Sequence, residues 1–146
     1  MAKAPLKKKK LPSISLLKRK ADTAFSILIR NRDSKNWVNK CFTCGVVKTI
    51  KELQAGHFIS RRYLSLRYDE TNVNCQCVGC NVFSQGNGSA YALNLTRKYG
   101  HEILEALEIR KNTLVKFTRK DYEELIKKYK IWHHLQKHLS VQWTQI

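Results

Sequence analysis

Four cysteines of the 146-residue chain form two Cys-x-x-Cys pairs whose spacing predicts a zinc site. The pairs are Cys41 with Cys44 and Cys77 with Cys80, and residues 45–76 lie between them. Each pair can direct two thiolates at one point, and two pairs complete the tetrahedron that Zn²⁺ prefers. Because four thiolates leave no open coordination position, we expect this Zn²⁺ to be structural, and its binding energy to contribute to folding.

One histidine and two asparagines lie inside this cysteine frame, and their side chains suit phosphodiester hydrolysis. A neutral His57 can take a proton from water, so we predict that it is the general base. Asn81 directly follows Cys80, and its amide oxygen suits a catalytic divalent ion such as Mg²⁺ or Mn²⁺. We expect Asn72 to tie the loop backbone together and so to orient His57. Each signal is weak alone, and the zinc frame around them is what indicates a ββα-metal nuclease site.

Three arginines follow His57 in the loop between the predicted strands: Arg61, Arg62 and Arg67. A guanidinium group binds phosphate with two parallel hydrogen bonds, so we predict that these residues contact DNA. The other interpretation is a solvated loop face.

The charge of the chain favours nucleic acid as its partner. Lys and Arg total 28 against 11 acidic residues, which gives a formal net charge of +17. Such a charge destabilises a compact fold by self-repulsion unless a polyanion binds, and DNA phosphates bind cations with release of counterions. Residues 1–12 are predicted to be a disordered basic arm that can wrap phosphate backbone, although a solvated tail is the alternative.

Neither a membrane span nor a signal peptide is predicted. No apolar run approaches the ~18 residues that a span needs, and the basic N-terminus leads into no apolar segment. We therefore expect a cytoplasmic protein with no membrane partner. Five cysteines in a reducing compartment favour metal binding over disulfides, and Cys75, which breaks the pair spacing, is interpreted as a small buried strand residue.

A single domain is expected over residues 13–146, because the length suits one core. Its first part, 13–36, is predicted to be a helix from about Ile14 to Ser34 that Ser13 caps, since apolar residues recur at helical spacing. The second part, 37–88, should hold the zinc-bound ββα core. Its predicted elements are strands over Glu52–Phe58 and Asn72–Gln76 and a short helix over Val78–Ser84.

The third part, 89–146, has helical patterning. We predict helices over Ser89–Tyr99, with Gly100 as the stop, and over His101–Lys111. A last helix begins after Thr118, and Asp121 approximates a capping box with it. Its apolar side, interpreted as core or docking surface, carries Tyr122, Leu125, Ile126, Tyr129, Trp132, Leu135 and Leu139. The fold class is therefore α+β, a zinc-stapled ββα-metal (His-Me finger) core flanked by N- and C-terminal helices.

The segment from Cys41 to Gly100 resembles the lambdoid phage NinG proteins, also called Rap, a family of recombination endonucleases of the HNH (His-Me finger) type. The step from Cys80 to Asn81 is also similar to that of phage endonuclease VII, a junction-resolving His-Me finger nuclease. This resemblance implies cleavage of branched DNA such as Holliday junctions and recombination intermediates. The motifs that carry it are Cys41-Phe-Thr-Cys44-Gly45, Ala55-Gly56-His57-Phe58, Leu66-Arg67-Tyr68-Asp69-Glu70, Asn72-Val73, Gln76-Cys77-Val-Gly-Cys80-Asn81, Gly86-Asn87 and Tyr91.

Two departures from this resemblance concern the catalytic metal. Many His-Me finger enzymes place an acidic ligand just before the catalytic histidine, where this chain has Gly56. We therefore expect the ion to rest on Asn81 with waters and phosphate oxygens, or to receive help from Asp69 or Glu70. Family members can also carry His and Lys shortly after the asparagine, where this chain has Phe83 and Ser84.

Three alternatives remain open from the sequence. A non-catalytic zinc module that binds nucleic acid explains the charge and the cysteines but gives no role to His57 or Asn81. An HNH nuclease with another task, such as restriction, homing or packaging-associated nicking, differs in its substrate. A redox protein is the third. Symmetric junction cleavage needs two active sites, so a homodimer through the long C-terminal helix is one expectation, and packing of that helix on its own domain is the other.

Overall fold

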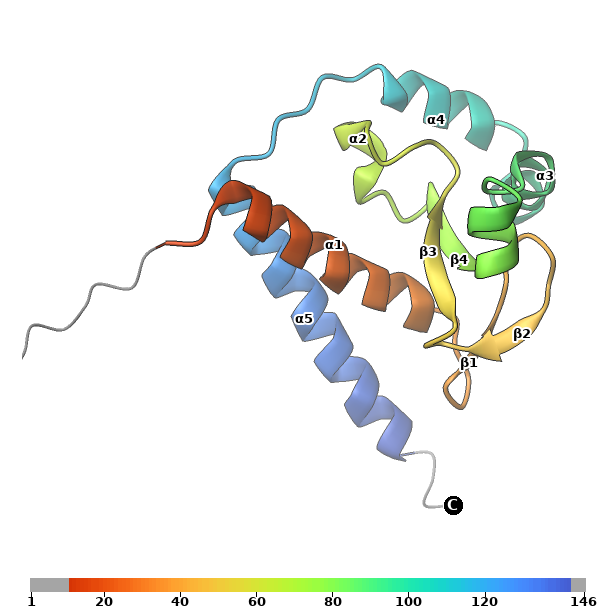
Figure 1. Cartoon of the computed structure of the whole chain (residues 1–146), viewed down its shortest axis with the longest axis horizontal. Coiled ribbons are helices and arrows are strands. Elements are labelled where there is room, and N and C mark those ends of the chain that lie inside the picture. The colour runs from red at the N-terminus through yellow and green to blue at the C-terminus, as the bar shows by residue number, and fades with distance from the viewer. Residues whose placement is uncertain (1–10, 143–146) are drawn as a thin grey trace, which may run out of the picture.

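The computed structural model describes residues 11–142, with side chains described up to Leu135, and it confirms the α+β class (Figure 1). The basic arm predicted at residues 1–12 lies outside the described part up to residue 10. Among the described residues no helix is long and apolar enough to cross a membrane. The elements are α1 (Ile14–Asn31), β1 (Val38–Lys40), β2 (Val47–Thr49), β3 (Leu53–His57), α2 (Leu64–Arg67), β4 (Val73–Cys77), the π-helical η1 (Gly79–Phe83), α3 (Gly88–Tyr99), α4 (Ile103–Lys111) and α5 (Arg119–Gln142).

Helix α1 begins where the sequence predicts and ends earlier. The Ser13 hydroxyl accepts a hydrogen bond from the Leu16 N–H at 3.2 Å, which caps the first turn. The helix stops at Asn31 instead of near Ser34, and Trp37 then adopts a left-handed backbone with φ of 63°. Residues 30–36 carry no apolar side chain that a further helical turn could bury, so packing does not extend the helix.

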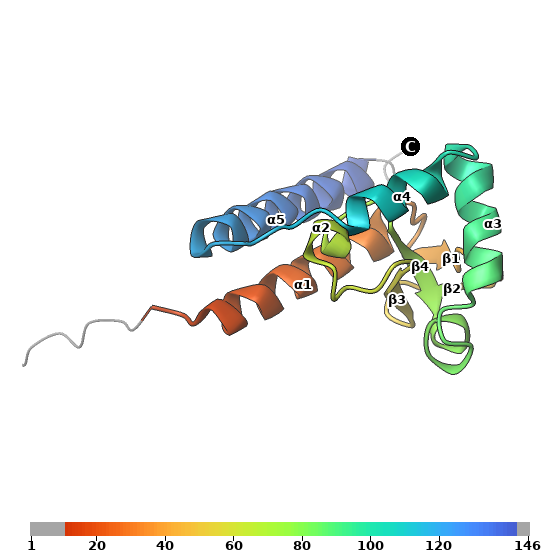
Figure 2. The same ribbon diagram turned by 90° about the horizontal axis from the view of Figure 1, so that it is seen from above.

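Helices α1 and α5 lie side by side along most of α1 in both views (Figures 1 and 2). Phe25 of α1 packs on Tyr129 of α5 with ring centroids 5.2 Å apart, and Val73 of β4 completes this cluster. Burying such a side chain contributes about 1.5–3 kcal/mol. Tyr122 is also buried, so the interpretation of the α5 aromatic residues as core is confirmed, whereas Leu135 is exposed.

The two antiparallel hairpins carry the motifs. β3 pairs with β4 from Leu53 opposite Cys77 to His57 opposite Val73, within one residue of the predicted strands. The β1–β2 hairpin holds the first cysteine pair and was not predicted, because its strands have three residues each and β2 is wholly exposed. The four-residue α2 is likewise too short to show a helical period.

A second cluster supports the loop between β3 and β4. Leu66 of α2, Tyr91 and Leu95 of α3, and Leu107 of α4 are fully buried together. The Tyr91 hydroxyl donates to the Gly56 carbonyl at 2.9 Å, so α3 is fixed to the strand that ends at His57.

Two predicted helix boundaries in this half of the chain are confirmed, whereas α4 begins at Ile103 instead of His101. Helix α3 ends at Tyr99, and Gly100 follows it with a φ of 92°, which disfavours other residues. The capping box before α5 is present, because the Thr118 N–H donates to Asp121 Oδ2 at 2.6 Å and the Asp121 N–H donates to Thr118 Oγ1 at 3.3 Å.

Candidate metal centre and catalytic cavity

The four paired cysteines converge on one point beside the end of β4. Their sulfur atoms all lie within 4.8 Å of one another, and the Sγ atoms of Cys44 and Cys77 are 3.8 Å apart. A tetrahedron with Zn–S bonds of ~2.3 Å separates its sulfurs by about 3.8 Å. Gly45 has a φ of 75°, a left-handed conformation that lets the first pair turn sharply. The four residues can therefore hold a metal ion such as zinc.

The thiols differ in how readily they ionise. Burial of Cys41 opposes ionisation, but hydrogen bonds from nearby backbone N–H groups and from the Thr43 hydroxyl outweigh it and lower the pKa of Cys41 to about 6. Cys75 is a buried residue of β4 outside the cluster, as we interpreted it, and burial raises the pKa of its thiol to about 12. Its sulfur is therefore a packing group rather than a metal ligand.

His57 ends β3 with one ring nitrogen fixed by the backbone. Its Nε2 lies 3.0 Å from the carbonyl oxygen of Arg67, and a carbonyl can only accept, so Nε2 carries the proton. Nδ1 then holds a free lone pair, which a general base requires. Burial lowers the pKa of His57 below its ordinary value, and the positive charges of Arg67 and Arg61 act in the same direction. The imidazole is therefore neutral at pH 7.

His57 and Asn81 line the same hollow. One cavity of about 500 Å³ has both residues in its wall, together with Arg61 and Gly86. An adjoining cavity of about 250 Å³ adds Asp22, Gln54 and Arg67 from neighbouring elements.

Asn81 is oriented from the opposite strand. Its Nδ2 donates to Gln54 Oε1 at 2.6 Å, and no donor among the described residues contacts its Oδ1. The cavity therefore presents an amide oxygen and a base to the same space.

Asn72 is fully buried and crosses the loop between β3 and β4. Its Oδ1 accepts from the Ile59 N–H at 2.8 Å. Its Nδ2 donates to the carbonyls of Ile59 at 2.9 Å and Leu66 at 3.1 Å. The side chain thus joins Ile59, two residues after His57, to Leu66, which directly precedes Arg67, and the Arg67 carbonyl holds the imidazole.

Gly56 has no room for the acidic ligand that the resemblance leads one to look for. A Cβ on Gly56 would lie 1.9 Å from Gln76 Oε1, because the fully buried Gln76 side chain fills that space. Gln76 is held there by donation from its Nε2 to the Gly86 carbonyl at 2.9 Å. A carboxylate at position 56 would require Gln76 to move.

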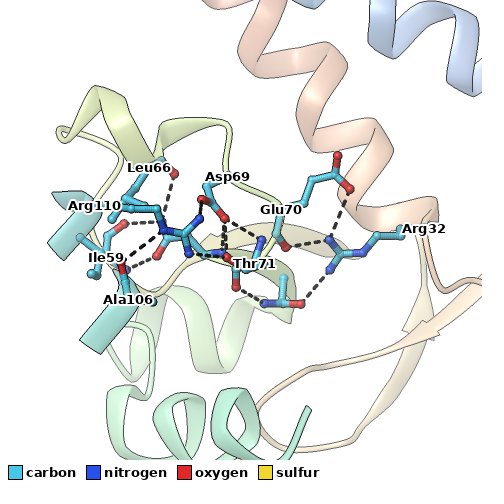
Figure 3. Close-up of polar contacts among 10 residues, drawn as sticks. Arg32, Ile59, Leu66, Asp69, Glu70, Thr71, Ala106 and Arg110 are labelled. Carbon is cyan, nitrogen blue, oxygen red and sulfur yellow. Dashed lines mark hydrogen bonds and ion pairs between the residues drawn. The ribbon is translucent and has the colours of Figure 1, made fainter. Parts of the chain in front are cut away.

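We expected that Asp69 or Glu70 could serve as an additional ligand of the catalytic ion. Neither residue lines a cavity that contains His57. Figure 3 shows Asp69 paired with Arg110 of α4 and with the Thr71 side chain, while the Glu70 carbonyl accepts from Arg32 at 2.8 Å. That expectation is therefore wrong. Both residues instead fix the loop that carries Asn72.

The three predicted DNA-contacting arginines differ in their surroundings. Arg61 and Arg62 are exposed, and Arg61 lines the His57 cavity. Arg67 is buried, and its Nε and Nη2 donate to the Asp22 carboxylate at 2.8 and 2.6 Å. Its fork is therefore occupied within the protein, and we correct its assignment from phosphate contact to positioning.

Asp22 and Gln54 are the site residues that the sequence reasoning missed. Asp22 lies on α1, far from the motifs in sequence, and it also accepts a hydrogen bond from the Tyr68 hydroxyl at 3.0 Å. One signal was present, because Asp22 is the only acidic residue among residues 1–32 and adjoins the apolar stripe of a basic helix. Gln54 carried no signal, since it occupies an ordinary strand position.

Comparison with known proteins gives a match along nearly all of the chain. The family model described as Bacteriophage Lambda NinG protein matches residues 2–138. Protein ninG of Escherichia phage 933W is 33% identical over 95 residues, which cover 64% of this chain and 45% of that protein. Protein ninG of Escherichia phage lambda is 32% identical over the same coverage, and that of Salmonella phage P22 is 32% identical over 91 residues, covering 62% and 43%. The chain thus spans about half the length of these relatives, and no solved structure matches it.

Proposed function

This chain belongs to the bacteriophage lambda NinG family, and we propose that it is a metal-dependent DNA endonuclease that cleaves branched DNA such as Holliday junctions. The observation that carries the proposal is the shared cavity of His57 and Asn81. In it a histidine of fixed tautomer and a free amide oxygen lie together beside a cluster of four cysteines. A zinc module that only binds nucleic acid has no use for that pairing.

The order of elements supports a ββα-metal interpretation of the core. The β3–β4 hairpin ends at Cys77, and η1 follows with the second cysteine of the pair, Cys80, and Asn81 on its one turn. We propose that structural zinc bound by the four cysteines fixes this turn against the hairpin. Asn81 then directly follows the zinc ligand Cys80, and the hydrogen bond to Gln54 fixes the orientation of its side-chain amide.

In the proposed reaction, His57 Nδ1 removes a proton from a water molecule, and the resulting hydroxide attacks the phosphorus. The bond from phosphorus to the 3′ oxygen breaks, which leaves 5′-phosphate and 3′-hydroxyl ends. A general base contributes about 10²–10⁴-fold to such a rate. The Arg67 carbonyl keeps the proton on Nε2, and it also accepts a hydrogen bond from the imidazolium that forms.

The residues present fit one weakly held divalent cation. Mg²⁺ or Mn²⁺ in this cavity would supply positive charge to the phosphorane and to the leaving oxygen. Asn81 Oδ1 is the hard ligand that the cavity offers, because Asp22, the only carboxylate that the described residues place in its wall, is paired with Arg67. Such ions usually keep several waters and bind together with phosphates, so we expect the ion to enter with DNA.

The direct test is cleavage of a four-way junction and of a linear duplex with matched sequence, with and without Mg²⁺. We expect cleavage only with the ion and a rate on the junction at least about tenfold above that on the duplex. Equal rates on both substrates would favour an HNH nuclease with another task. Tight binding without any Mg²⁺-dependent cleavage would favour the non-catalytic zinc module.

A second prediction concerns Asp22, whose charge holds Arg67 and through it the carbonyl that contacts His57. Breaking a buried ion pair costs ~3–5 kcal/mol, and because the Asp22 side chain is 28% exposed we expect about 2 kcal/mol for Asp22→Asn. The junction cleavage rate should fall about tenfold, because a displaced carbonyl loosens the imidazole. Unfolding in urea and single-turnover cleavage measure the two effects.

The pH profile separates positioning from a general loss of stability. Burial lowers the pKa of His57, and the negative charge of Asp22 partly opposes this shift. The inflection of the rate should therefore move to lower pH in Asp22→Asn. Asp33→Asn, at an exposed position after α1, is the matched control and should change neither rate nor inflection. A slower Asp22 variant with an unmoved inflection would leave Asp22 with a structural role only.

A further inference from the structure

Beside the two cavities that contain His57, a groove runs between the first half of α1 and the loop after β3. It encloses about 600 Å³. Its walls are Ser15, Lys18, Arg19, Ser60, Arg61 and Arg62, and the Asp22–Arg67 pair also borders it. The motifs recognised in the sequence assign no binding or catalytic role to Ser15, Lys18 or Arg19.

The groove carries positive charge that the protein does not neutralise. Lys18, Arg19, Arg61 and Arg62 form no ion pair with any residue in the described part of the chain. Asp22, the one carboxylate in its wall within the described part of the chain, is already paired with Arg67. Four cations held around one groove repel each other, and a bound anion relieves that repulsion.

The groove continues the catalytic cavity. Arg61 lines both, and Asp22 with Arg67 borders the groove and the adjoining cavity that contains His57. At 1.5 Å per residue, Ser15 to Asp22 spans about 10 Å of α1. One DNA strand advances ~3.4 Å per nucleotide along the helix axis, so this length matches about three nucleotides.

We propose that this groove binds the phosphates of the cleaved strand on one flank of the scissile bond, about two to four nucleotides from it. The inference rests on the proposed nuclease function and adds the path of its substrate. Lys18, Arg19, Arg61 and Arg62 pair with phosphate oxygens, and the Ser15 and Ser60 hydroxyls are suited to donate to them. The strand thus passes from His57 across the loop and along α1 toward the N-terminus of that helix.

The first measurement is the salt dependence of junction binding by the double variant Lys18→Ala/Arg19→Ala. Each lost phosphate contact lowers the slope of log K against log salt by ~0.9, so we expect a slope smaller by about 2. Affinity near 0.15 M salt should fall about tenfold. The control is Lys35→Ala/Lys51→Ala, which removes the same charge from exposed positions near the β1–β2 hairpin, at the other end of α1 (Figures 1 and 2).

The second measurement locates the phosphates. Junctions with neutral methylphosphonates at positions two to four on one side of the cut, then on the other, are compared for binding by wild-type protein. We expect weaker binding for one flank only, and a clearly smaller loss in the Lys18/Arg19 variant, because two of the four cations that contact those phosphates are gone.

The outcomes separate this inference from the proposed function. If wild-type protein cleaves junctions while the Lys18/Arg19 variant keeps the salt slope of its control or the full wild-type sensitivity to methylphosphonates, the groove proposal fails alone. If wild-type protein binds no DNA, both proposals fail together. Circular dichroism and thermal unfolding of the variants check that both pairs of substitutions leave the fold intact.

Discussion

Replacing His57 with alanine is expected to lower Mg²⁺-dependent junction cleavage by about 10²–10⁴-fold while leaving DNA affinity within about twofold of wild type. The imidazole is the only described side chain in the cavity wall that is a neutral nitrogen base at pH 7. The hydrogen bond of its ring goes to the Arg67 carbonyl and not to the exposed arginines that we assign to phosphate. Single-turnover rates and binding curves on the same junction measure both quantities.

The matched control is His101→Ala, an exposed histidine in the turn between α3 and α4. It removes the same side chain far from the cavity, so its cleavage rate should equal that of wild type. If the His57 variant also cleaved at the wild-type rate, another group would have to be the base. Loss of binding together with cleavage would instead place His57 in the DNA contact.

The same assignment fixes the direction of the pH dependence. Burial lowers the pKa of His57 below the ordinary 6.5, so the native protein keeps the ring neutral at pH values where the unfolded chain has begun to protonate it. The cleavage rate should rise with pH through an inflection below about 6.5 and then level off. Stability should fall as the pH drops below about 6.5, because the unfolded state binds more protons there.

The parts of the site that could be predicted are those defined by residues close together in the sequence. Each Cys-x-x-Cys pair is recognisable from the spacing of four consecutive residues. Asn81 is adjacent to Cys80 in the sequence, so its position in space follows from that of the cysteine. The β3–β4 strands were readable because each alternates or runs apolar between turn residues. Chemistry that depends on neighbours in sequence is therefore visible without a structure.

The parts that were missed depend on contacts between distant segments. An arginine in the loop after His57 suggests a phosphate contact, and only the fold shows that Arg67 is already bound by Asp22 from α1. Asp69 looks like a free ligand until α4 brings Arg110 to it (Figure 3). In a chain with this many cations, pairing partners are decided by tertiary packing, which no local pattern records.

Gly56 illustrates how a missing residue can be explained only in three dimensions. From the sequence, a glycine before the base is an absent ligand. In the fold, the Gln76 side chain occupies the space that a side chain at position 56 would need. Gln76 Oε1 is buried without a hydrogen-bond partner among the described residues, so this contact costs free energy. The glycine and the glutamine are therefore one packing feature, and we expect a substitution of either alone to disturb the packing between β3 and β4.

Removal of the metal from the four-cysteine cluster is expected to unfold the central part of the chain. The β1–β2 hairpin has three-residue strands and an exposed β2, so it buries little apolar surface of its own. Zinc contributes ~10–16 kcal/mol in small zinc domains, as much as the whole stability of a typical protein. Cys44→Ser should therefore lower Tm by about 15 °C or more, because serine is a poor zinc ligand.

Cys44 is the sharpest position for this test, because its side chain is exposed and its loss leaves no cavity in the core. The control is Cys75→Ala, a buried cysteine outside the cluster, which should keep one zinc per chain and lose only about 1–2 kcal/mol of stability. Metal analysis and thermal unfolding before and after chelation distinguish the two variants. Asn81 follows Cys80 directly, so the chelated protein should also lose junction cleavage even when Mg²⁺ is restored. An unchanged Tm after chelation would mean that packing alone holds the cysteines together, and the zinc assignment would be wrong.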